Sequence, residues 1–150
     1  MSSSLKILIE LAQKQSDDSA KQLGKLNFQK QEADQKLHLL LEYRHSYQAR
    51  FQDLARNGID HIEWQNFVTF INKLDAAITE QRQAVAQTLA NRVIGSENFV
   101  TCQRKLKSYN TLSKRQQKIK DQRQMKHEQR LQDEHAAKSS TQKKYPPEDN

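Results

Sequence analysis

Apolar residues recur at alternating spacings of three and four from Leu5 to Arg56, which is the heptad pattern of a coiled-coil helix. Ten of the fourteen a and d positions in this stretch are apolar. The a positions are Ile9, Ser16, Leu23, Lys30, Leu37, Arg44 and Phe51, and the d positions are Ala12, Ser19, Leu26, Ala33, Leu40, Tyr47 and Leu54. The pattern predicts one long helix over about residues 5–56.

A second apolar seam follows and predicts another helix over about residues 61–138. Its positions are Trp64, Phe67, Ile71, Leu74, Ile78, Gln81, Val85, Thr88, Arg92, Gly95, Phe99, Cys102, Leu106 and Tyr109. Residues 139–150 are polar and contain both prolines of the chain, Pro146 and Pro147. We expect this stretch to be a disordered tail.

Residues 57–60 carry the signals of a tight turn between the two helices. Gly58 is suited to the left-handed conformation that ends a helix. Asp60 is a potential N-cap, with Glu63 placed to complete a capping box and Ile59 and Trp64 placed to form a hydrophobic staple. The prediction is an all-α fold: a long antiparallel two-helix coiled-coil hairpin that is a monomer on its own.

Folding at Gly58 places residues whose numbers sum to about 119 side by side. Gly95 then lies level with Gly24, which fits either a close approach of the helices or a bend. In this register residues 115–138 have no facing helix, over a length of about 36 Å. A lone polar helix is marginal in water, so we expect this overhang to fray or to bind a partner.

The composition is too polar for a wide globular core and suits a thin helical structure. Hydrophobic residues make up 35% of the chain, and 20 residues are Gln. Cys102 is the single cysteine, and with no signal peptide or long apolar run visible the simple inference is a cytoplasmic protein. Neither a catalytic constellation nor a metal- or cofactor-binding motif is present in the pattern, so we do not expect an enzyme.

The positive charge is concentrated in one segment, residues 104–130, which holds ten Lys or Arg and only two acids. Its local charge is +8, whereas the whole chain is +7. Four interpretations are open: a solvated helix face, an arm that binds an acidic protein, a nucleic-acid site, or a membrane-surface site. The candidate partner-binding cations are Arg115, Lys118, Lys120, Arg123, Lys126 and Arg130.

A second stripe of residues flanks the seam of the second helix at helical spacing: Phe70, Leu74, Ala77 and Gln81. Leu40, Tyr43 and Tyr47 form a similar flank on the first helix. Such a stripe is either a docking face for another protein, or a place where the Phe70 ring folds over the edge of the seam.

Several motifs resemble the FliJ family of flagellar type III export proteins. They are residues 40–47 (Leu-Leu-Glu-Tyr-Arg-His-Ser-Tyr), residues 57–59 (Asn-Gly-Ile), residues 64–67 (Trp-Gln-Asn-Phe) with Phe70 beyond, and the opening residues 5–12 (Leu-Lys-Ile-Leu-Ile-Glu-Leu-Ala). The resemblance covers most of residues 5–138.

The resemblance implies a non-enzymatic stalk for the hexameric flagellar export ATPase, docked on the membrane export gate and escorting substrate-specific export chaperones. It assigns gate binding to the stripe at Phe70, Leu74 and Ala77, with Gln81 in the fourth position, where the family can have His. It also implies a cytoplasmic location at the inner face of the inner membrane. The alternative from the residues alone is a basic coiled coil that binds nucleic acid or another polyanion.

Overall fold

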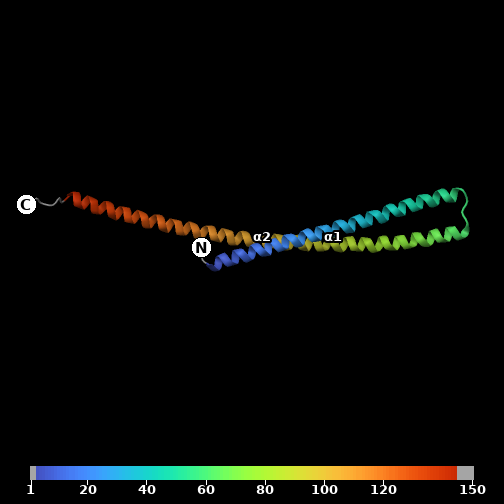
Figure 1. The fold of residues 1–150 in the computed structure, drawn as a ribbon, viewed down its shortest axis with the longest axis horizontal. Coiled ribbons are helices and arrows are strands. Elements are labelled where there is room, and N and C mark those ends of the chain that lie inside the picture. Colours follow the sequence, from blue (N-terminus) through green and yellow to red (C-terminus); the bar gives the residue numbers. More distant parts are fainter. Residues whose placement is uncertain (1–2, 145–150) are drawn as a thin grey trace, which may run out of the picture. The chain divides into compact units, whose positions relative to one another are not determined.

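The computed structural model describes residues 3–144. Helix α1 spans Ser3–Arg56 and helix α2 spans His61–Lys144, and between residues 3 and 144 there is no strand (Figure 1). The two helices pack against each other, so the predicted all-α hairpin is confirmed. The chain divides into two compact units: residues 14–103, here called the hairpin unit, and residues 3–13 with 104–144, here called the terminal unit.

In the hairpin unit the two helices run antiparallel, in the register that the turn predicts. Arg44 of α1 pairs with Asp75 of α2, at 2.5 Å between Nε and Oδ1. Further from the turn, the Gln81 side-chain amide donates to the Ala33 carbonyl oxygen, at 3.0 Å. From the first pair to the second, the residue number falls on α1 and rises on α2, as an antiparallel seam requires.

The heptad assignment agrees with the observed burial over most of the hairpin. Ala33, Leu74 and Ile78 are buried, and the a and d residues from Ile9 to Phe51 are all buried or half-buried. The predicted seam is wrong at the turn end of the hairpin, where Leu54 is 56% exposed and Trp64 is 45% exposed. The reason is that the seam closes one layer earlier, on the stacked rings of Phe51 and Phe67, whose centroids are 3.7 Å apart.

The turn confirms Gly58 as the residue that ends α1. Its φ is +87°, and it is the one residue between 3 and 144 with a positive φ. The Gly58 N–H donates to the Ala55 carbonyl oxygen at 3.3 Å, and the Trp64 N–H donates to the Asp60 carbonyl oxygen at 3.0 Å. The Trp64 ring is partly exposed and lies against His61, with centroids 6.2 Å apart, and the hydrophobic staple with Ile59 stays a prediction.

The two glycines inside the helices have different roles. Gly95 is buried, and a Cβ atom placed on it would lie 2.5 Å from Leu26 Cδ1 and 3.6 Å from Leu23 Cδ1. Gly24 is exposed, and a Cβ atom there would meet nothing within 4 Å. The close-approach interpretation therefore holds for Gly95, which gives the Leu26 side chain room to reach α2.

The terminal unit contains the start of α1 and the longer C-terminal part of α2. Leu5 and Ala12 are buried there, and Leu106, Tyr109 and Ser113 are half-buried. Every residue from Lys114 to Thr141 is exposed. The structure thus contains the predicted overhang, beginning within one residue of the expected position.

Helix α2 continues to Lys144, beyond the end that we predicted at Lys138. Residues 139–144 are therefore helical, and the rest of the predicted tail, residues 145–150, lies outside the described residues. Ser and Thr are only mild helix breakers, and Thr141 satisfies its hydroxyl by donating to the Ala137 carbonyl oxygen at 2.9 Å. The first strong stop signal is Pro146, which disfavours helical geometry at the residue before it.

Candidate protein-binding surfaces

Five aromatic rings form a continuous cluster across the seam near the turn: Tyr43, Tyr47, Phe51, Phe67 and Phe70. Tyr47 is the centre of this aromatic cluster, with its ring centroid 5.1 Å from that of Phe67 and 4.5 Å from that of Phe70. Tyr43 meets the Phe70 ring edge-on, at 6.0 Å. Tyr43 remains 54% exposed, so the cluster begins inside the seam and ends at the surface.

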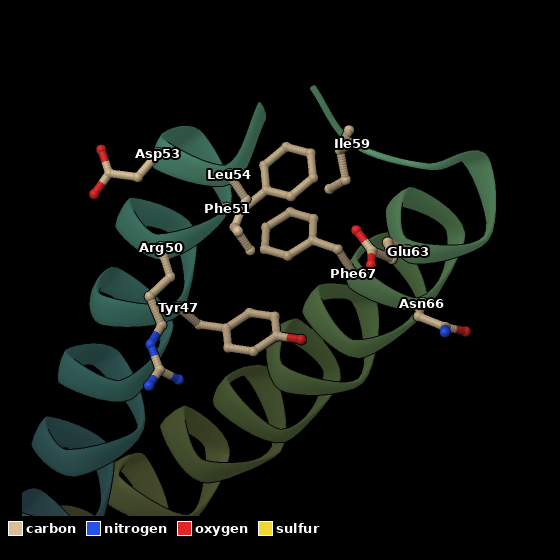
Figure 2. Close-up of a pocket in the computed structure, with 9 residues that line it drawn as sticks. All are labelled: Tyr47, Arg50, Phe51, Asp53, Leu54, Ile59, Glu63, Asn66 and Phe67. Carbon is tan, nitrogen blue, oxygen red and sulfur yellow. The ribbon is translucent and has the colours of Figure 1, made fainter. Parts of the chain in front are cut away.

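An open pocket of about 590 Å³ lies beside the aromatic cluster at the turn end of the hairpin. Figure 2 shows the Phe51 and Phe67 rings between the two helices, with Ile59 close to them. The residues that line the pocket are Tyr47, Arg50, Phe51, Asp53, Leu54, Ile59, Glu63, Asn66 and Phe67. The pocket has an apolar floor and a charged rim. Its presence shows that the two helices pack less tightly at the turn end than further along the hairpin unit.

The predicted stripe on α2 is only partly at the surface. Phe70 and Ala77 are half-buried, whereas Leu74 is 8% exposed and Gln81 is 9% exposed. The stripe is therefore divided: Leu74 and Gln81 face α1, as their places in the predicted seam require, and Phe70 and Ala77 lie at the edge of the seam. Leu40 and Tyr47 on α1 are half-buried as well. The Phe70 ring folds over the edge of the seam onto Tyr47, and this packing leaves part of the ring accessible.

Arg44 and Asp75 form an ion pair across the seam, next to the aromatic cluster. Arg44 Nη2 also lies 3.5 Å from Asp75 Oδ2, so the guanidinium contacts both carboxylate oxygens. The hydrogen bond to Asp75, with the attraction of its charge, raises the pKa of Arg44 above its usual range. Like other arginines, Arg44 is charged at physiological pH, and its pair with Asp75 fixes the register of the two helices.

The ten cations of residues 104–130, here called the basic segment, lie on helix α2 in the terminal unit. All six predicted partner-binding cations are exposed: Arg115, Lys118, Lys120, Arg123, Lys126 and Arg130. Between residues 3 and 144, no ion pair involves a cation of this segment. Its two acids are engaged locally instead, because Gln117 donates to Asp121 at 3.0 Å and Gln124 donates to Glu128 at 3.4 Å.

A shallow groove of about 650 Å³ lies at the start of the basic segment. Its lining residues are Arg104, Lys107, Ser108, Tyr109, Thr111, Leu112 and Arg115. By contrast, Lys and Arg balance Asp and Glu in residues 14–103, eleven against eleven. The two units thus present different surfaces: neutral and aromatic in the hairpin unit, cationic in the terminal unit.

The sequence profile of the flagellar FliJ protein family matches residues 1–144. The chain is also 30% identical, over 112 residues, to the flagellar FliJ proteins of Salmonella typhi and of Escherichia coli strain K12, covering 75% of this chain and 76% of each relative. The chain belongs to the FliJ family. The membership confirms the resemblance drawn from its motifs, and it makes the chain a component of flagellar protein export. Helices long and apolar enough to cross a membrane are absent from residues 3–144.

Three features of this FliJ-family chain were not predicted from the sequence. The Arg44–Asp75 pair could have been found, because the two numbers sum to 119, the register set by the turn. Phe51 and Phe67 were assigned to the seam, but their continuity with the exposed Tyr43 was not seen. The pocket at the turn had no sequence signal, since every residue at its floor also fits a closed coiled coil.

Proposed function

We propose that this FliJ-family chain is a non-enzymatic stalk and adaptor of the flagellar export machinery. Its basic segment binds the hexameric export ATPase, and the aromatic cluster with Ala77 binds the cytoplasmic side of the membrane export gate. The chain also escorts substrate-specific export chaperones, and it works at the cytoplasmic face of the inner membrane. The observation that carries this proposal is the unequal surface chemistry of the two units, one neutral and aromatic, the other cationic.

The two proposed contacts differ in their physical basis. Contacts between exposed charges are screened, with a Debye length of about 8 Å at physiological salt. Burial of apolar surface is not screened in this way. Binding of the ATPase should therefore weaken as salt rises, while binding of the gate should change little.

Two sets of substitutions test this division. Lys118→Glu, Arg123→Glu and Lys126→Glu together should weaken ATPase binding and leave gate binding intact, because these side chains are exposed and unpaired in the structure. Tyr43→Ala with Phe70→Ala should do the reverse. Leu74 is a poor choice for this test, since it is buried and its loss would loosen the seam.

Binding of both partners is measured with purified proteins over a salt series, and circular dichroism of each variant reports on folding. Equal damage to both partners by either set, with helicity intact, would contradict the division between the units. Tight binding of duplex DNA without any ATPase binding would instead favour the polyanion-binding alternative. Such binding should fall steeply with salt as phosphates are neutralised.

A further inference from the structure

The charges of the basic segment are distributed unevenly around helix α2. At about 3.6 residues per turn, eight of the ten cations fall within one half of the helix circumference. Both acids, Asp121 and Glu128, fall in the other half and are held there by Gln117 and Gln124. One side of the helix is therefore a cationic face with no neutralising acid from Arg104 to Arg130.

Two apolar residues lie among the cations of this face. Leu112 and Ile119 are one heptad apart, and they are 44% and 49% exposed. Arg115 and Lys126 lie along the same face. The groove beside Leu112, lined in part by Arg104, Lys107 and Arg115, gives an incoming apolar side chain room at one end of the strip.

We propose that this face is a docking site for an acidic amphipathic helix of a protein partner, which packs on Leu112 and Ile119 as a short second coiled coil. A narrow apolar strip with cations on both sides is complementary to a helix with apolar a and d positions and Glu at e and g. The two apolar positions, one heptad apart, set where the partner helix lies, and the flanking charges select for acidic partners.

Two other kinds of partner fit the face less well. A membrane surface favours a helix whose apolar residues share one broad side, whereas Met125 and Leu131, although 67% and 52% exposed, point away from Leu112 and Ile119. Single-stranded nucleic acid favours aromatic rings between the cations, but Tyr109 is half-buried on the side that faces α1. An acidic helix uses both the charge and the apolar strip.

This inference deepens the proposed function, on which it rests only for assigning the basic segment to a protein partner. The test uses the full chain and a labelled synthetic peptide of about four heptads, with Leu at a and d and Glu at e and g. Binding is followed by fluorescence anisotropy at about 150 mM salt. A peptide of the same composition with its Leu positions scrambled separates helix packing from simple attraction of a polyanion.

Leu112→Gln with Ile119→Gln should weaken binding of the heptad peptide by about tenfold or more. Met125→Gln with Leu131→Gln is the matched control, because both residues lie about 100° or more around the same exposed helix from Leu112 and Ile119, and it should alter binding by less than about twofold. Circular dichroism should show unchanged helicity in both, since all four residues are exposed.

Equal binding of the two peptides, or equal effects of the two double substitutions, would overturn the docking site. So would equally tight binding of short duplex DNA, or of vesicles of three parts phosphatidylcholine to one part phosphatidylglycerol. If ATPase binding depends on the cations but not on Leu112 and Ile119, this inference fails while the proposed function stands. If the peptide binds as described but the ATPase does not bind the chain, the proposed function fails instead.

Discussion

Replacing Gly95 by Ala tests how closely the two helices of the hairpin unit approach each other. The added methyl group would lie 2.5 Å from Leu26 Cδ1, so that side chain must withdraw by about 1 Å to reach ordinary contact. Overpacking of this kind costs about 1–3 kcal/mol. The gain in helix propensity from Gly to Ala is about 1 kcal/mol. We therefore expect Gly95→Ala to lower the free energy of unfolding by about 0–2 kcal/mol.

Gly24→Ala is the matched control, because that position is also helical but has nothing within 4 Å of the added Cβ atom. It should raise the free energy of unfolding by about 1 kcal/mol. Both values are measured by urea denaturation followed by circular dichroism at 222 nm. The two substitutions should thus differ by about 1–3 kcal/mol, which is the packing cost alone.

A double substitution locates the cause of that difference. With Leu26→Ala already in place, the contacting atom is gone, and Gly95→Ala should become stabilising by about 1 kcal/mol. If Gly95→Ala stabilised the original chain as much as Gly24→Ala does, the helices could not approach each other closely at Gly95. The Leu26 side chain would then not limit the space for a Cβ atom at Gly95.

Three further predictions concern the turn, the seam and the state of association. Gly58→Val should destabilise the chain by about 1 kcal/mol or more in thermal melts, because φ is +87° there, while Gly58→Asn should be tolerated better. Gln81→Glu should lower the free energy of unfolding by about 1–3 kcal/mol at neutral pH, because a buried carboxylate cannot donate to the Ala33 carbonyl oxygen. Acid should restore part of this stability by protonating the carboxylate, and a urea midpoint independent of pH would contradict this. Light scattering after size exclusion should give a mass near 17.6 kDa, and a stable mass of twice that would disprove the monomeric hairpin.

The hairpin could be predicted from the sequence because its local signals agree with one another. The heptad pattern, the Gly58 stop and the sum rule of about 119 all specify the same register, and Arg44 and Asp75 obey it. Even the polar Gln81 was placed correctly in the seam, because burial at an a or d position depends on spacing more than on residue type. Its hydrogen bond to Ala33 then satisfies the buried amide.

The features that could not be predicted depend on the size and direction of side chains rather than on spacing. Trp64 and Leu54 fit the heptad pattern, but the large rings of Phe51 and Phe67 close the seam before those positions are reached. In the same way, spacing placed Phe70 at the edge of the seam but left open how its ring would lie, and in the structure the ring folds onto Tyr47. Helical spacing predicts the side of the helix on which a residue lies only to within about one position. It therefore cannot decide whether a residue at the edge of a seam is buried or exposed.

Of all these features, the role of the basic segment is the one that the sequence determines least. Polar seam residues such as Arg44 and Gln81 find their partners within the chain, so their interactions follow once the register is known. The cations from Arg104 to Arg130 form no ion pair with any of the described residues, and the two acids of the segment lie on the other side of the helix. A face that carries this much uncompensated charge is stable in water, but folding of the hairpin does not require it. We therefore expect the pattern of Leu112 and Ile119 among cations to reflect a partner outside the chain.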